Sequence, residues 1–281
     1  MSDYREIKGT NIEVVTSDPS NLVDGQIWFN STSNKIKLNK ITTTGSWATG
    51  APLGTQRNGS GGAGIQTAAL CMGGSTGPPV RSALTEHYDG SSWTAGGNLS
   101  VARNLTRGCG VETAALLVAG FSPPSTNAVE EYNGSSWTAG GNYPAPVDRI
   151  GGAGTQTAGL GWGGWSPALP GRYDTSNHYD GSAWTSGGTL VNGFHNMACS
   201  GTQTAALSAG GQHSPPSDYK TYVYDGSAWT TDTDMPQPFV SGQGAQNSPS
   251  TAAAVFGGNS TTPNCFEFTG AGSIVETVTS S

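Results

Sequence analysis

A ten-residue segment, YDGSSWTAGG at 88–97, recurs in this chain with small changes. The copies begin at the tyrosines Tyr88, Tyr132, Tyr179 and Tyr224. The tryptophans Trp93, Trp137, Trp184 and Trp229 follow at intervals of 44 to 47 residues, and Trp47 precedes the first by 46. An apolar marker such as QTAALCMGG (66–74) keeps the same interval. A period of about 40 to 50 residues built from short strands predicts a β-propeller.

One cycle contains four expected strands. The glycine-rich 59–65 suits the crowded innermost strand, and the apolar 68–74 suits a second strand buried on both faces. Residues 83–90 alternate in polarity as a third strand does, and 91–97 form the outer strand after an Asp-Gly turn. The fold class is therefore all-β, with four-stranded antiparallel blades.

The number of blades has two interpretations. Five cycles lie between residues 57 and 281, and the last is degenerate, with Phe268 in place of the tyrosine. The first 50 residues hold four further candidate strands, at 11–17, 26–30, 35–39 and 45–50. We expect six blades, with residues 1–50 as a divergent first blade or anchor and 51–281 as the repeats. The alternative is five blades with a separate N-terminal anchor, in which the strand at Trp47 closes the ring.

Composition excludes several classes of protein. The chain has 281 residues, 43 of them glycine, and a net charge of −7 without a basic run, so phosphate neutralisation on nucleic acid is not expected. No apolar stretch approaches about 18 residues, so we expect no membrane insertion. The four cysteines show no CxxC spacing and are interpreted as buried thiols: Cys71, Cys109, Cys199 and Cys265.

The repeated tyrosines and tryptophans are interpreted as packing residues, because a tryptophan on each outer strand can bury about 150–250 Å² between blades. Asp89 is interpreted as a turn residue. His87 and His178 share one repeat position, before the tyrosine, and are interpreted as surface strand positions because another cycle has Val223 there. No catalytic motif is found, and we expect no catalytic residue, metal or cofactor.

Connections differ between the two ends of the propeller. The turns from strand one to two and from three to four are short and nearly identical, whereas the loops from strand two to three and between blades vary. A rigid ring that presents variable loops is typical of a binding protein. The candidate ligand-binding residues in these loops are Trp165, Arg172, Tyr173, His213, Tyr219 and Lys220.

The cycle resembles kelch repeats, which combine an apolar run ending in Gly-Gly with a tyrosine, a turn and a tryptophan. Arg57, Arg103 and Arg149 stand where kelch units often carry arginine. The segments 152–164 and 179–188 look like the kelch-like repeats in virion proteins of marine tailed phages. Residues 7–38 look like the N-terminal segment of phage fibre and structural proteins.

This resemblance implies a non-enzymatic virion structural protein, made in the host cytoplasm and carried on the particle. It would bind other virion proteins through its N-terminal segment and recognise host surface glycan, as tail-fibre or receptor-binding proteins do. Capsid or collar decoration is an alternative, and self-association into a homo-oligomer stays open. A glycan-degrading propeller is a further alternative, which would need two or three carboxylates facing the channel; the inner strands offer glycine, alanine, cysteine and serine, with Glu112 alone.

Overall fold

The computed structural model describes residues 13–17, 27–38, 49–168, 173–213, 219–244, 252–257 and 265–269. The chain divides into two compact units, Met1–Thr49 and Gly50–Ser281. The described residues form strands and turns and contain no helix, so none of them forms a helix long and apolar enough to cross a membrane.

The first unit contains one three-stranded sheet, β1 (Glu13–Val15), β2 (Ile27–Asn30) and β3 (Lys35–Leu38). Strand β2 pairs parallel with β1 and antiparallel with β3. The parallel pair departs from the antiparallel pattern expected of a blade. Trp47, in the fourth candidate strand, lies outside the described residues.

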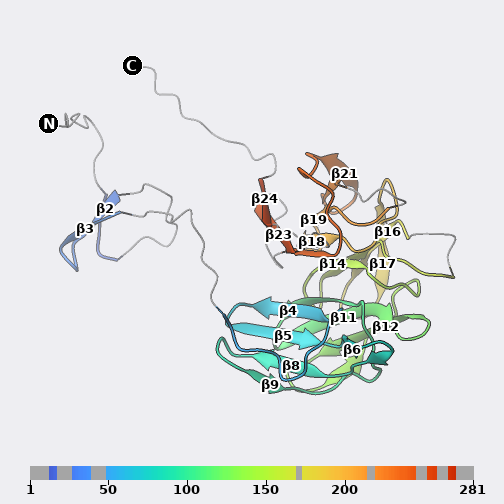
Figure 1. The fold of residues 1–281 in the computed structure, drawn as a ribbon. Helices are drawn as coiled ribbons and strands as arrows, with labels where there is room; N and C mark the ends of the chain where they lie inside the picture. Colours follow the sequence, from blue (N-terminus) through green and yellow to red (C-terminus); the bar gives the residue numbers. More distant parts are fainter. Residues whose placement is uncertain are drawn as a thin grey trace. The chain divides into compact units, whose positions relative to one another are not determined.

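The second unit is a propeller-like arrangement of antiparallel sheets that follow one another in chain order (Figure 1). Blade 1 comprises β4 (Gly61–Ile65), β5 (Ala68–Met72), β8 (Thr85–Tyr88) and β9 (Trp93–Ala95). Blade 2 comprises β10 (Arg107–Val111), β11 (Ala114–Phe121), β12 (Ser125–Tyr132) and β13 (Trp137–Ala139). Blade 3 comprises β14 (Gly151–Gly154), β15 (Gly159–Trp162), β16 (Thr175–Tyr179) and β17 (Trp184–Thr189).

Blade 4 comprises β18 (Ala198–Gly201), β19 (Ala206–Ala209), β20 (Thr221–Tyr224) and β21 (Trp229–Asp232). The last sheet has three strands in the described part of the chain: β22 (Gly242–Gly244), β23 (Ala252–Gly257) and β24 (Cys265–Thr269). A short hairpin, β6 (Ser75–Gly77) and β7 (Val80–Arg81), extends from blade 1. The four-stranded antiparallel blade is confirmed, and the count of six blades is not.

Glycine lets the inner strands approach one another. A Cβ on Gly108 would lie 2.5 Å from Gly62 O of the preceding blade, and one on Gly244 would lie 2.1 Å from Cys199 O. Contacts this short exclude any side chain, which confirms the expectation that the innermost strand is crowded.

Hydrogen bonds of the main chain run from blade to blade at the start of the inner strands. The N–H of Leu105 donates to Gly59 O, that of Arg149 to Leu105 O, that of Asn196 to Arg149 O, and that of Ser241 to Asn196 O, at 2.7 to 3.1 Å. All five residues have positive φ, between 53° and 62°. Only one of them is glycine, and a positive φ strains the other four side chains.

Each repeated tryptophan packs on the tyrosine of its own hairpin, with ring centroids 4.8 to 4.9 Å apart. The indole N–H then donates to the preceding blade. Trp137 donates to Thr85 Oγ1, Trp184 to Gly141 O and Trp229 to Ser176 Oγ, at 2.8 to 3.1 Å. Trp93 donates to Ala51 O at 3.1 Å. The repeat therefore supplies one indole contact at each junction among blades 1 to 4.

The position before the tyrosine also joins blades. His87 Nε2 lies 2.7 Å from the Tyr132 hydroxyl of blade 2, and His178 Nε2 lies 2.7 Å from the Tyr224 hydroxyl of blade 4. In blade 2 the equivalent Glu131 accepts the hydroxyl proton of Tyr179. The interpretation of His87 and His178 as surface positions is therefore wrong, because both side chains are half-buried and contact the tyrosine of the next blade.

The arginine position needs a second correction. Arg57 pairs with Glu86 at 2.5 Å and Arg103 with Glu130 at 3.1 Å, both inside their own blades. Arg57 precedes the bridging residue Asn58, whereas Arg149 follows the equivalent Asp148. Arg149 thus lies two residues further along the repeat than predicted. It pairs with its neighbour Asp148 and not with a glutamate of the third strand.

The remaining predictions about turns and thiols are confirmed where the structure describes them. Asp89 Oδ1 accepts the backbone N–H groups of Ser91 and Ser92 at 2.8 and 2.7 Å, and Gly90 has a φ of 92°. Cys71, Cys109 and Cys199 are buried free thiols.

Candidate functional site

The strand registers place the variable loops together at one end of the blades. In blade 1, Ile65 pairs with Ala68 and Tyr88 with Trp93, so the two short turns lie at one end. The opposite end carries the start of β4, the loop after β5 and the connections between blades. We call this opposite end the variable face.

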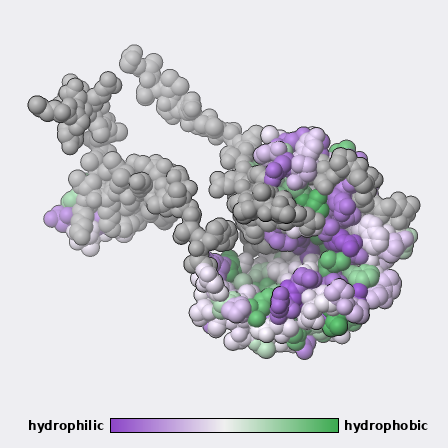
Figure 2. Space-filling view, viewed as in Figure 1, coloured by the Kyte–Doolittle hydropathy of each residue, from purple (hydrophilic) through white to green (hydrophobic). Residues whose placement is uncertain are grey.

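Two adjoining cavities open on the variable face. The channel mouth, of about 450 Å³, is lined by the starts of the inner strands of blades 1 to 4 and by β22. The outer groove, of about 560 Å³, lies over blades 1 to 3. Asn58, Leu105 and Arg149 line both cavities, so the two adjoin one another. The space-filling view shows the larger unit hollowed at its middle (Figure 2).

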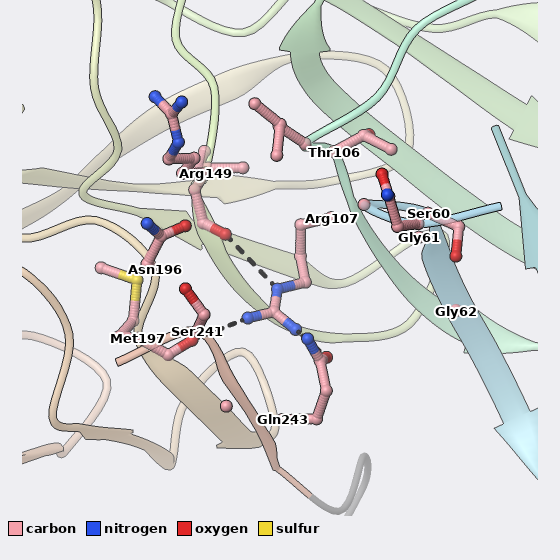
Figure 3. A pocket seen from close by; sticks show the side chains of 15 residues that line it. Ser60, Gly61, Gly62, Thr106, Arg107, Arg149, Asn196, Met197, Ser241 and Gln243 are labelled. Atoms are coloured by element: carbon pink, nitrogen blue, oxygen red, sulfur yellow. Dashed lines mark hydrogen bonds between the residues drawn. The ribbon is translucent and has the colours of Figure 1, made fainter. Parts of the chain in front are cut away.

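Arg107 crosses the channel mouth from blade 2 (Figure 3). Its guanidinium donates to Met197 O at 3.0 Å, to Gln243 Oε1 at 3.1 Å and to Ile150 O at 3.4 Å. It thereby contacts the next two blades and the last sheet. Glycine or alanine occupies the equivalent position in blades 1, 3 and 4, which leaves room for the Arg107 side chain.

Two arginines in the outer groove lie over aromatic rings. Arg81, at the end of β7, lies 4.5 Å from the centroid of Phe121, and Arg149 lies 5.4 Å from that of Trp165. These are cation–π distances, which hold a guanidinium in place while its edge stays open to a ligand. Arg81 also donates to Pro79 O at 2.8 Å. The groove therefore presents two oriented cations.

The carboxylate of Asp148 forms an ion pair with Arg149. This buried carboxylate accepts a hydrogen bond from Ser125 Oγ at 2.7 Å and lies 2.6 Å from Arg149 Nη1. Burial raises the pKa of Asp148 above its ordinary value, with Ser125 and Arg149 opposing the shift. Each oxygen of this carboxylate thus has a hydrogen-bond donor, and the carboxylate positions the arginine.

The structure places one of the six predicted ligand residues, Trp165, in the outer groove. Tyr173 packs against the core of blades 2 and 3, with its ring 6.1 Å from that of Tyr143. His213 lies against Phe194. Tyr219 is exposed beside Lys220, and Lys220 Nζ lies 2.7 Å from Asp234 Oδ2. Arg172 lies outside the described residues.

Sequence reasoning missed Arg81, Arg107, Phe121 and Arg149 as residues of these cavities. Arg81 and Phe121 both belong to variable loops that contain Pro-Pro. An arginine and an aromatic residue at the ends of neighbouring variable loops could have signalled the pair. Arg107 gave no such signal, because a single arginine in a glycine-rich strand has no counterpart in other cycles.

In the described part of the chain, no three His, Cys, Asp or Glu side chains gather as metal ligands would. A search against known protein families and a search of curated proteins found no match to this sequence.

Proposed function

We propose that this chain is a non-enzymatic structural protein of a tailed-phage particle, which binds host surface glycan through the variable face. The observation that supports the binding role is the pair of adjoining cavities on that face, with Arg81 and Arg149 held over aromatic rings. The repeats and residues 7–38 support the virion role by resemblance. The N-terminal segment would then attach the propeller to other virion proteins.

The two ends of the blades differ in a way that supports this proposal. Asx turns such as those at Asp89 and Asp180 repeat the same bonds at one end, where they stabilise each blade. The variable face differs from blade to blade, and rigid blades hold its loops in fixed positions. Rigid loops lose little conformational entropy when a ligand binds.

A glycan-degrading role has weaker support. A retaining or inverting glycosidase needs two carboxylic groups placed across the scissile bond. Among the described residues that line the two cavities, Asp148 is the one carboxylate, and it is occupied by Ser125 and Arg149.

We further propose that the ring has five blades. Trp184 donates to Gly141, which follows Trp137 by four residues, and Trp93 donates to Ala51, which follows Trp47 by four residues. Ala51 thus takes the place that Gly141, just after the outer strand of blade 2, takes at the junction of blades 2 and 3. An experimental structure with six complete blades would contradict this proposal.

Location on the particle tests the virion role. Purified phage particles are analysed for this chain by mass spectrometry, and a gold-labelled antibody then places it. Label on the tail fibres or tail tip supports host recognition, whereas label on the head or collar indicates decoration. Absence of the chain from the particles would refute the virion role.

A further inference from the structure

We propose that the outer groove binds a sugar acid, with the ligand carboxylate held by Arg81 and Arg149. This inference rests on the proposed glycan-binding function and names the class of sugar. The first observation is the charge of the residues that line the groove. The whole chain has a net charge of −7, yet this groove is lined by two arginines and the adjoining channel mouth by a third, Arg107.

The other basic side chains described from Gly50 onward are paired with carboxylates. Arg57 and Arg103 are buried against Glu86 and Glu130, and Lys220 lies beside Asp234. Arg81 has no carboxylate within ion-pair distance among the described residues. Arg149 shares one nitrogen, Nη1, with Asp148. An anion in the groove would therefore find guanidinium N–H groups that are not already paired with a carboxylate.

Phe121 and Trp165 favour a sugar ring over a free inorganic anion. Both rings line the groove, and Pro78, Pro79 and Pro167 fix its rim. Aromatic edges and proline rings offer apolar contact to the C–H face of a pyranose, while guanidinium groups recognise a carboxylate with paired N–H donors. At about 560 Å³, the groove has the size of a typical small-ligand site.

Isothermal titration calorimetry on the full chain tests this proposal. The probes are oligosaccharides of uronic and sialic acids, their methyl esters, which keep the sugar and remove the charge, and an oligoglutamate of matched charge. We expect binding of at least one sugar acid, with affinity lowered about tenfold or more by esterification. Loss of one charge-assisted contact has this effect.

Arg81→Gln and Arg149→Gln should each weaken sugar-acid binding by about tenfold. Lys220→Gln is the matched control and should leave it unchanged, since Lys220 is paired with Asp234. If Arg149→Gln fails to fold, Arg81→Gln still tests the proposal. The described contacts of Arg81 are one hydrogen bond to Pro79 O and the Phe121 ring, so its loss should leave the fold intact.

Equal binding of acid and ester, or tighter binding of oligoglutamate, would overturn the proposal. So would unchanged affinity in Arg81→Gln or no binding of any sugar acid. None of these results bears on the location of the chain on phage particles, so a failure here is distinguishable from a failure of the virion role.

Discussion

The polar side-chain pair at the junction between blades 3 and 4 can be replaced by the apolar pair found at the next junction, between blade 4 and the last sheet. His178 and Tyr224 form a polar pair at this junction. At the next junction the equivalent residues are Val223 and Phe268, which pack against the same apolar cluster. The position before the tyrosine and the aromatic residue of the following blade therefore change together. The double variant His178→Val, Tyr224→Phe imitates this apolar pair.

The expected energies follow from two hydrogen bonds. The Tyr224 hydroxyl donates to Gly187 O, so its oxygen can accept from His178 Nε2, 2.7 Å away, when the histidine is in its Nε2–H tautomer. With about 1 kcal/mol per bond, Tyr224→Phe should cost about 2 kcal/mol and His178→Val about 1 kcal/mol. Since both changes remove the same shared bond, the double variant should cost about 2 kcal/mol, not 3. The coupling energy is then about 1 kcal/mol.

Urea unfolding of the full chain at pH 7.5 measures these four free energies. Burial lowers the pKa of His178, so its ring is neutral at this pH. Tyr88→Phe combined with His178→Val provides the control, because the Tyr88 hydroxyl bonds to Gly90 O within its own turn. The control pair should be additive. Additivity of His178→Val and Tyr224→Phe within about 0.3 kcal/mol would refute the coupling between blades.

Three further changes test other parts of the ring. Arg107→Met should remove the contacts across the channel mouth, cost about 2–3 kcal/mol and lower Tm by about 5–10 °C; a fall under 1 °C contradicts this. Gly108→Ala places a Cβ 2.5 Å from a neighbouring carbonyl, whereas the nearest atom to a Cβ on Gly62 is 3.8 Å away. The first should therefore unfold in less urea than the parent and the second should not; similar midpoints would disprove the crowding. Hydrogen bonds lower the pKa of the turn carboxylates Asp89, Asp180 and Asp225. Their stabilisation is complete above the ordinary pKa of 3.8 and is lost as pH falls through the lower folded values. Asn133 accepts the same bonds without titrating, so a triple Asp→Asn variant should lose less Tm between pH 5 and pH 2.5, and an equal loss would show that these turns do not contribute.

The sequence was sufficient to predict the blade because each strand has a local signature. Alternation located β8, the apolar run located β5, and the glycine-rich stretch located β4. The tryptophan interval predicted the packing of blades, and the Asp-Gly pair predicted positive φ at Gly90. These signals depend on neighbours along the chain, which a single sequence displays.

The groove depends on residues that no local signature joins. Arg149 and Trp165 belong to blade 3, and Arg81 and Phe121 come from blades 1 and 2. The channel mouth is harder still to predict from the sequence. Gly59, Leu105 and Ser241 share a positive φ and a backbone hydrogen bond to a neighbouring blade, but their side chains are of different types. Such positions are defined by neighbouring blades, so composition and period do not reveal them.

Hydrogen–deuterium exchange on the full chain, with and without a purified bacterial surface polysaccharide of the kind that the proposed virion role implies, tests the central claim most directly. The claim is that the variable face over blades 1 to 3 binds glycan. We predict that the polysaccharide slows exchange in residues 75–81, 119–125 and 147–149, and leaves the turns at 89–92 and 180–183 unchanged. Slowed exchange at those turns, or none anywhere at saturating polysaccharide, would contradict the account.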